Sequence, residues 1–395
     1  MRYGMIMAGG AGTRLWPMSR PGRPKQLLPL IGGRSLLDLA ADRLEGVVPP
    51  ARRYLCIDEA LRGIVRRQVP QFSDAQILGE PAGRDTLNAV GFTAAVLVRE
   101  DPDAIFTVLT SDHIIEPQDA FRASLEVGFT LVESDPSRFV TFSVRPTEPS
   151  TAFGYVERGA PVEGMAEAWH VKRFVEKPDA PTARSFLDAG TFEWNAGMFV
   201  FHAATFLETL ARYRPKNHAL LDRIGAAWNG PERDQTLGAC YPELEKVSVD
   251  YGMMEPASED PAIDICTVPM AVEWADLGSW PSYADTLDAD ADGHRTNAAS
   301  ALHLGSRNIT VVTEDPDELV TTIGCEDLIV IRSGRRTLIC RPADAQRVRE
   351  MAEQAAKLEA ARTRGVSDSD GSDSGGSEFG GPGTPTMHRG IGLDR

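Results

Sequence analysis

The sequence predicts an α/β fold with a mixed, mostly parallel, Rossmann-like sheet, followed by a small β-rich domain. Between residues 1 and 110, short β-rich runs such as Tyr3–Ala8 and Ile105–Thr110 alternate with longer helical patterns, which is typical of a sheet covered by helices on both faces. After His294 the pattern changes to short β-like runs separated by turn residues. We therefore expect a large domain over residues 1–290 and a small domain over 291–365 that ends in a helix.

Individual elements have local signals of their own. Ser35 can cap a helix whose apolar residues recur at helical spacing, and Gly46 lies just past its end. A second helix is predicted over Thr86–Glu100, where Pro102 prevents continuation. Further strands are predicted at Tyr54–Ile57, Gln76–Leu78, Phe139–Val144, Val171–Val175, Gly197–Phe201, Ile309–Thr313, Leu328–Ile331 and Thr337–Cys340, and further helices at Pro181–Ala189, Ala203–Tyr213 and from Pro342 to about Ala361.

The C-terminal segment, residues 366–395, differs in composition from the rest of the chain. It consists largely of Ser, Gly and Asp and contains very few apolar side chains. Such a segment cannot bury enough apolar surface to offset the entropy lost on ordering. We expect it to be disordered.

The charge of the chain argues against nucleic acid as a partner. Lys and Arg number 41 and Asp and Glu 57, which gives a formal net charge of −16, and such a field repels a polyanion. No stretch approaches the roughly 18 consecutive apolar residues of a membrane span. We expect neither nucleic acid nor a membrane among the partners.

The N-terminus and the cysteines favour a cytoplasmic location. The first residues, MRYGMIMAGG, lead directly into a glycine loop and lack the cleavage site of a signal peptide. The five cysteines are scattered, odd in number and never spaced as CxxC, which argues against a disulfide framework and against a zinc site. Reduced thiols in the cytoplasm are the expected state.

A glycine-rich loop follows the first predicted strand and could bind phosphate. Glycines allow backbone N–H groups to approach a phosphate closely, and a following helix N-terminus adds a favourable dipole. Neither the dinucleotide fingerprint nor the Walker loop fits, because Leu15 holds the last fingerprint position and no Gly-Lys-Ser/Thr is present. The alternative is that the glycines only form a tight turn. The loop residues are Ala8, Gly9, Gly10, Gly12 and Thr13.

Two cations close to this loop strengthen the phosphate interpretation. Arg14 and Lys25 are separated by a segment that Pro17, Pro21 and Pro24 stiffen. Two fixed cations beside a glycine loop suit a triphosphate. The alternative is a solvated basic loop.

The segment GGAGTRLWPMSRPGRPKQLLPL, Gly9–Leu30, closely resembles the signature of the sugar-1-phosphate nucleotidylyltransferases, specifically the mannose-1-phosphate guanylyltransferases. The resemblance extends to about residue 360 and recurs at separate points along the chain. It implies a GT-A-like nucleotidyltransferase fold and a β-solenoid-like C-terminal domain, which could support a homodimer. The matching segments contain Glu80-Pro81, Thr110–His113, Thr151–Tyr155, Phe174–Pro178, Trp194–Gly197, Ser248–Gly252 and Trp274–Trp280.

The resemblance assigns a role to each candidate site residue. It implies catalytic roles for Arg14, Lys25, Asp112 and Asp276, with the two aspartates holding Mg²⁺. Nucleotide binding is implied for Ala8, Gly9, Gly10, Gly12, Thr13, Glu80, Arg84, Thr86 and Ser111, and sugar-phosphate binding for Gly154, Glu176, Lys177 and Asn195. An aspartate pair suits Mg²⁺, which takes one or two carboxylates together with phosphate oxygens and water. We interpret His113 as a positioning residue, and Trp194 and Trp274 as core.

The expected reaction is transfer of GMP from GTP to mannose 1-phosphate, which gives GDP-mannose and pyrophosphate by direct in-line attack with Mg²⁺. No general base is needed, because a phosphate monoester with a second pKa near 6 is largely dianionic at neutral pH. Three alternatives stay open: another hexose or heptose 1-phosphate, another nucleoside triphosphate, and a regulatory homologue that binds nucleotide sugars without turnover. An NAD-dependent oxidoreductase is disfavoured by Leu15 and by the loop cations.

One segment departs from the family pattern. The family usually shows Arg-Asn-Thr-Ala-Pro-Ala, whereas this chain has Arg-Asp-Thr-Leu-Asn-Ala over residues 84–89. Asp85 could simply replace Asn as a helix cap. Alternatively, the change alters base or sugar selectivity.

Overall fold

The computed structural model describes residues 1–10, 12–315 and 317–367. The chain divides into two compact units, Met1–Arg349 and Glu350–Arg395. The last helix, α11, spans Val348–Ser367 and so includes the first two residues of the segment predicted to be disordered. The remainder of that segment, 368–395, lies outside the described residues.

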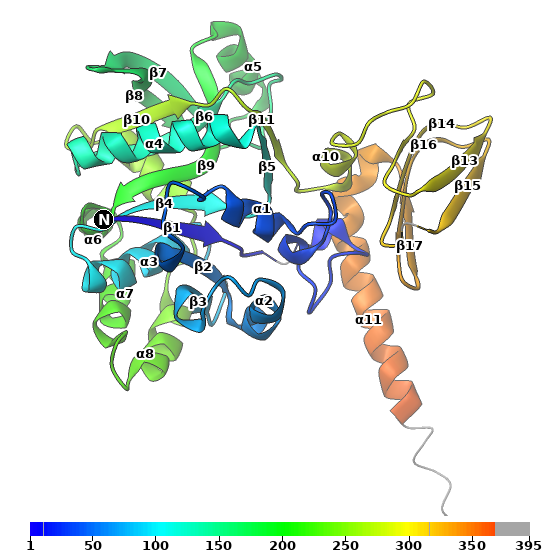
Figure 1. Ribbon diagram of the computed structural model, residues 1–395, viewed down its shortest axis with the longest axis horizontal. Coiled ribbons are helices and arrows are strands. Elements are labelled where there is room, and N and C mark those ends of the chain that lie inside the picture. Colours follow the sequence, from blue (N-terminus) through cyan, green and yellow to red (C-terminus); the bar gives the residue numbers. More distant parts are fainter. Residues whose placement is uncertain (11, 316, 368–395) are drawn as a thin grey trace, which may run out of the picture. The chain divides into compact units, whose positions relative to one another are not determined.

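One large sheet organises the first unit (Figure 1). Its order is β3-β2-β1-β4-β9-β6-β10-β8-β7, with parallel pairing from β3 to β4 and between β6 and β10, and antiparallel pairing around β9, β8 and β7. This confirms the predicted α/β fold with a mixed, mostly parallel sheet. The strands are β1 Arg2–Met7, β2 Arg53–Asp58, β3 Ile77–Glu80, β4 Ile105–Thr110, β6 Phe139–Val144, β7 Tyr155–Val162, β8 Met165–Val175, β9 Phe192–His202 and β10 Ile265–Pro269.

Helices pack on both faces of the sheet and create two hydrophobic cores. Met5 and Ile6 of β1 enter different cores, because successive side chains of a strand point to opposite faces. Figure 1 shows α4 along one face and α3, α7 and α8 along the other. The first core receives α1 Leu36–Asp42, α2 Arg62–Gln68, α4 Gln118–Ser134 and α5 Ala180–Ala189, and the second receives α3 Thr86–Glu100, α6 Ala203–Tyr213, α7 Pro215–Ala227, α8 Arg233–Cys240 and α9 Glu255–Glu259.

Several predicted elements agree closely with the structure. Helix α3 has the predicted bounds, and the Ser35 side chain accepts a hydrogen bond from the Asp38 N–H at 3.1 Å, as a cap should. Helix α4 was not predicted, although Phe121, Leu125 and Phe129 repeat at the spacing of one buried helix face. Among the described residues, no helix is long and apolar enough to cross a membrane.

The region after residue 294 is β-rich, as predicted. Most of its strand pairs are parallel, and its first helical turn is a 3-10 helix at Pro342–Arg347 that leads into α11. Ile331 and Leu338 pack in one core with Leu15 and Leu28 of the glycine-loop segment. The strands are β12 Arg295–Thr296, β13 Ser300–Leu304, β14 Arg307–Thr313, β15 Leu319–Ile323, β16 Glu326–Ser333 and β17 Arg336–Cys340.

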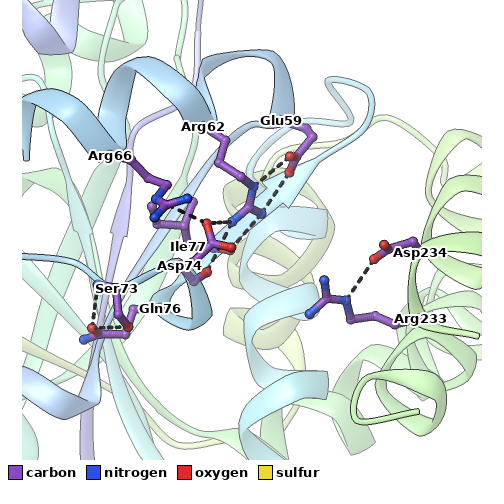
Figure 2. A network of polar contacts seen from close by, with 9 residues as sticks. All are labelled: Glu59, Arg62, Arg66, Ser73, Asp74, Gln76, Ile77, Arg233 and Asp234. Carbon is purple, nitrogen blue, oxygen red and sulfur yellow. Dashed lines mark hydrogen bonds and ion pairs between the residues drawn. The ribbon is translucent and has the colours of Figure 1, made fainter. Parts of the chain in front are cut away.

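A polar network supports strand β3 (Figure 2). Arg62 of α2 forms ion pairs with Glu59 and Asp74, and it also donates a hydrogen bond to the Ile77 carbonyl at 3.0 Å. Ile77 is the first residue of β3, and Glu80 is its last. The network therefore holds in place a strand that carries a candidate binding residue.

Candidate active site

A cavity of about 660 Å³ lies where β1, β3 and β4 end. Open α/β sheets bind ligands outside the carboxyl ends of their strands. The cavity brings together most of the predicted site residues, namely Gly9, Gly10, Arg14, Glu80, Arg84, Thr86, Asp112, Gly154, Glu176, Lys177, Asn195 and Asp276. The others, Ala8, Gly12, Thr13, Lys25 and Ser111, belong to the same segments but do not line it.

The glycine loop has a backbone that only glycine accommodates readily. Gly10 and Gly12 have φ values of 91° and 58°, and a Cβ on Gly12 would lie 2.7 Å from the Cβ of Lys25. The buried side chain of Gln26 donates hydrogen bonds to the carbonyls of Gly9 and Gly10, the second at 3.3 Å. Gln26 was not predicted as a site residue, although it lies within the Gly9–Leu30 signature and next to Lys25.

The two predicted metal-binding aspartates converge through a small two-stranded ribbon. Strand β5, His113–Glu116, pairs antiparallel with β11, Glu273–Asp276, so that Asp276 faces His113. One ligand atom each from Asp112, His113 and Asp276 lies within 4.8 Å of the others. Lys25, itself buried, forms an ion pair with Asp112. The carboxylate oxygens fit a divalent cation such as Mg²⁺.

His113 is held in one tautomer. The Trp274 indole, which can only donate, gives its Nε1–H to Nδ1 of His113 at 3.2 Å. The proton of the neutral ring must therefore be on Nε2, which lies 3.9 Å from Oδ1 of Asp112. Burial lowers the pKa of His113, which keeps the ring neutral. This form directs an N–H toward the carboxylate cluster and supports the interpretation of His113 as a positioning residue.

The tryptophans differ in exposure. Trp194 is buried, as expected for a core residue, whereas Trp274 is partly exposed and lines the cavity. Trp274 does pack against the first core, as interpreted, but it also forms part of the cavity wall. Its indole N–H donates to the His113 nitrogen there.

Opposing effects act on Asp112. Burial raises the pKa of its carboxyl group, but the charge and the hydrogen bond of the Lys25 ammonium act against burial, and the pKa lies below its ordinary value. Asp112 is therefore ionised at neutral pH and available to a metal ion.

On one side of the cavity, Glu80 presents a carboxylate. It accepts a hydrogen bond from the buried Tyr241 hydroxyl at 2.6 Å. Burial raises the pKa of Glu80, and the Tyr241 hydrogen bond opposes that effect. The Thr86 hydroxyl, also at this side, accepts a hydrogen bond from the Val249 N–H at 2.9 Å. The Arg84 guanidinium bonds the Pro242 carbonyl.

The segment that departs from the family pattern has mainly structural contacts. Asp85 caps α3, with its carboxylate 2.9 Å from the Thr86 nitrogen. Asn88 is fully buried and donates to the carbonyls of Arg84 and Glu245 at 2.6 and 2.8 Å. These contacts favour the interpretation of Asp85 as a substitute helix cap, although Asp85 also lines the cavity.

The opposite side of the cavity is formed by buried polar side chains. The Asn195 carbonyl oxygen accepts hydrogen bonds from the Thr141 hydroxyl at 2.8 Å and from the Gly197 N–H at 3.1 Å, which orients its NH₂ group. That NH₂ group donates to Asp250 at 2.9 Å. A Cβ on Gly154 would clash with a Glu176 carboxylate oxygen, so a side chain there would displace the Glu176 carboxylate.

Asp250 is a site residue that the predicted set lacks, although its segment was recognised as similar to a sugar-phosphate pocket. It starts a π-helical turn, Asp250–Met254, of the kind often found at functional sites. Burial, followed by the nearby Glu176 carboxylate, raises the pKa of Asp250 to about 7. Lys177, whose Nζ lies 2.6 Å from Glu176, is a nearby cation.

The fold and the site together place the chain in a known class. The Nucleotidyl transferase family model matches residues 3–293, and the MannoseP isomerase/GMP-like beta-helix domain matches residues 300–355. The chain belongs to the nucleotidyl transferase family. The identification from sequence motifs is thereby confirmed, while the domain boundaries at 290 and 365 stay predictions.

Curated and solved relatives narrow the class. The chain is 36% identical over 366 residues to a mannose-1-phosphate guanylyltransferase of Escherichia coli K12, covering 89% of this chain and 73% of the relative. It is 34% identical over 375 residues to the xanthan biosynthesis protein XanB of Xanthomonas campestris, covering 92% and 75%. A crystal structure described as a mannose-1-phosphate geranyltransferase from Thermus thermophilus superposes with a TM-score of 0.79 at 30% identity, covering 90% and 99%. The chain is a nucleotidyltransferase of the sugar-1-phosphate type.

Proposed function

We propose that this protein transfers GMP from GTP to mannose 1-phosphate and releases pyrophosphate. The carrying observation is the position of the Asp112–Asp276 carboxylate cluster in the cavity wall, together with a cationic glycine loop and a set of buried hydroxyl-binding side chains. Metal-binding carboxylates and a cationic glycine loop suit phosphates, and buried hydroxyl-binding side chains suit a sugar. The relatives named for mannose-1-phosphate guanylyl transfer favour this substrate pair.

Glu80 supports guanine as the base. An ionised carboxylate only accepts hydrogen bonds, and guanine presents two adjacent donors, N1–H and N2–H₂, on one edge. Adenine, cytosine and uracil have no such adjacent pair. Tyr241 already occupies one oxygen of Glu80 and fixes the direction of the carboxylate.

Asp112 and Asp276 would hold Mg²⁺. When bound, the ion would neutralise the charge on the phosphates and orient them for in-line displacement. In the protein itself, the Lys25 ammonium balances the negative charge of Asp112, and the His113 ring faces the same carboxylate. Arg14 lines the cavity next to Asp276, since both are neighbours of Gly278.

The chemistry requires positioning rather than a base. An oxygen of the sugar phosphate attacks the α-phosphorus of GTP, a new P–O bond forms, and the bond to the β-phosphate breaks to release pyrophosphate. Lys177 would hold the acceptor phosphate, while Glu176 and Asn195 bond the sugar hydroxyls. Arg14 would stabilise the leaving pyrophosphate from the cavity wall, and Lys25, which is paired with Asp112 and does not line the cavity, would act on it through its charge. Homodimer formation and cytoplasmic location stay predictions.

The test is pyrophosphate release over a grid of nucleoside triphosphates and sugar 1-phosphates. We expect the highest kcat/KM with GTP and mannose 1-phosphate, and a lower value with ITP, which lacks the N2 amino group. Glu80→Gln should reduce the preference for GTP over ITP by about 10- to 100-fold, the usual effect of losing one hydrogen bond to a charged group.

Glu100→Gln is the matched control, because Glu100 accepts a comparable hydrogen bond from Tyr54 at 3.0 Å but does not line the cavity. It should leave the preference unchanged. Equal use of GTP and another triphosphate by the unmodified protein would refute guanine specificity and leave the reaction class intact.

A further inference from the structure

Arg43, which directly follows α1, is fully buried, with 0% of its surface exposed. Arginine is almost never buried to this extent without a paired carboxylate. In the part of the chain that the structure describes, however, its guanidinium bonds only two backbone carbonyls. Its Nε is buried and has no partner among the described atoms. Burying a guanidinium without a paired carboxylate is unfavourable, so the groups around Arg43 must account for its position.

The two carbonyls belong to the turn that carries a metal-binding aspartate. Nη1 donates to Thr110 at 3.2 Å, and Nη2 donates to His113. Thr110 ends β4 and His113 begins β5, so the guanidinium spans the two residues between them, Ser111 and Asp112. The planar fork of arginine can serve two acceptors in a fixed geometry, which a lysine ammonium cannot match.

The rest of the turn is anchored from other directions. The Ser111 N–H donates to the Met7 carbonyl at 3.1 Å, and the Asp112 carbonyl accepts from the Leu277 N–H at 3.1 Å. Arg43 adds support through the carbonyls at the two ends of the turn. All of these contacts involve backbone atoms of the turn, which leaves the Asp112 carboxylate free to face Lys25 and Asp276.

The charges of Arg43 and Asp112 also favour each other. Burial lowers the pKa of Arg43 to about 10, and the negative charge of Asp112 is the largest effect in the opposite direction. Arg43 is thus still a cation at neutral pH, and Asp112 is the principal carboxylate that compensates it through space.

We propose that Arg43 is a positioning residue for Asp112: its guanidinium fixes the turn 110–113 and so sets the affinity of the site for a divalent metal, without contact to substrate. The proposal rests on the proposed function only in taking Asp112 as a metal ligand. Residues that orient metal ligands typically contribute 10- to 100-fold to metal affinity or activity.

The test measures Mn²⁺ binding without substrates, by water-proton relaxation, in Arg43→Lys. We expect at least ~10-fold weaker binding. Hydrogen exchange of the peptide covering residues 105–116 should be faster in this variant, while exchange in β9 stays unchanged. In an Asp112→Asn background, Arg43→Lys should weaken binding no further, because coupled residues are not additive.

Arg53→Lys is the matched control. Arg53 also donates to two backbone carbonyls, those of Val48 at 2.9 Å and Leu44 at 3.1 Å, but these lie outside the metal-binding turn. Its Mn²⁺ affinity should stay within about twofold of the unmodified protein, well below the 10-fold effect of a residue that orients a ligand.

Other results would overturn the proposal. One is unchanged Mn²⁺ affinity together with unchanged hydrogen exchange in Arg43→Lys, and another is an equal loss of Mn²⁺ affinity in Arg53→Lys. If both Arg43→Lys and Arg43→Gln fail to fold, Arg43 has a role in stability only. If the unmodified protein binds no Mn²⁺, the metal assignment fails, and the exchange of peptide 105–116 alone decides whether Arg43 holds the turn. A different nucleotide or sugar specificity changes none of these readouts.

Discussion

Under the proposed function the two sides of the cavity bind different substrates. The side that would bind the nucleotide has Arg14 and Arg84 close to a glycine loop, whereas the side that would bind the sugar is lined by the carboxylates Glu176 and Asp250 with the cation Lys177 beside them. The first arrangement suits phosphates, because cations and backbone N–H groups stabilise spread negative charge. The second suits hydroxyl groups, which can donate to carboxylates. Both sides also contain carboxylates, so the glycine loop and its two arginines are what distinguish the first side from the second.

The two sides also differ in how they are supported. The glycine-loop segment packs against the β-rich region, since Leu15 and Leu28 share a core with Ile331 and Leu338. Arg23 of the same segment forms an ion pair with Glu314. The sugar side is instead held by hydrogen bonds within the large sheet and its adjoining π turn. The glycine-loop segment therefore depends on residues after 300, whereas Glu80 and the sugar side are supported within the nucleotidyltransferase part of the chain.

The largest effect is expected from removing the two carboxylates that would hold the metal in the proposed function. Asp112→Asn and Asp276→Asn should each lower kcat by at least ~10², the usual effect of losing a principal electrostatic stabiliser. Glu273→Gln, on the same strand as Asp276 but at the other end of the ribbon, should change kcat little. Steady-state kinetics at saturating Mg²⁺ measures all three variants. Rates near normal in both aspartate variants would show that the cluster does not hold the metal.

Two lysines test whether the sides act at different stages of the reaction. Lys25→Met should lower chiefly kcat, by about 10²-fold if it stabilises the leaving pyrophosphate. Lys177→Met should raise chiefly the KM for the sugar phosphate, because uniform binding appears in KM. Steady-state kinetics with each substrate varied in turn separates the outcomes. An increase in the KM for GTP alone in Lys177→Met would mean that the two subsites are exchanged.

Lys25→Met has a second expected effect, on pH dependence. The Lys25 ammonium lowers the pKa of Asp112. Its removal should raise that pKa, so that protonation of Asp112 begins at a higher pH. The acid limb of the kcat profile should therefore move to higher pH, whereas in Lys177→Met it should stay in place.

Residue patterns alone indicated the chemistry of the glycine-loop segment, whereas the sugar-side residues needed the family resemblance, and the reason is physical. The glycine loop, Arg14 and Lys25 lie in one contiguous segment, so their spacing alone indicates the chemistry. Helix caps such as Ser35 are equally local, and the structure confirms that cap. Asp250 depends instead on partners from β9 and from the segment after β8, far away in the sequence. Only a family resemblance could point to its segment, and the raised pKa depends on burial that no spacing shows.

Buried supporting residues were missed for the same reason. Gln26 and Arg43 donate to backbone carbonyls of the two loops that hold the site. Gln26 lies within the Gly9–Leu30 signature but has no role assigned from sequence, and Arg43 lies outside the matching segments. The support that each gives to a loop follows only from the fold that buries it. Sequence patterns thus predict the groups that contact ligands more readily than the groups that hold those ligand-binding loops in position.

The smallest expected effect concerns Asp250 and tests whether the sugar side shares protons. The pKa of Asp250 is raised to about 7 in the folded protein, while an unfolded aspartate has its ordinary value near 3.9. Between these values, the folded protein holds a proton that the unfolded chain has released, so stability falls as pH rises through this window. Asp250→Asn keeps an acceptor for Asn195 but cannot titrate. Its melting temperature relative to the unmodified protein should therefore rise from about pH 4 to about pH 7 and then level off.

Thermal unfolding of both proteins across this range measures the effect, and Asp260→Asn serves as the control. Hydrogen bonds from Tyr213 and Ala262 lower the pKa of Asp260, so its contribution changes only below the ordinary aspartate range. In the same pH range, ionisation of Asp250 adds negative charge beside Glu176. The KM for a dianionic sugar phosphate should therefore rise as pH rises through 7. Asp250→Asn should remove that rise in KM. If the melting temperatures of the unmodified protein and Asp250→Asn change with pH in parallel, Asp250 is ionised throughout this range. The sugar side would then bind its substrate beside two full negative charges, and Lys177 would be the adjacent cation that offsets them.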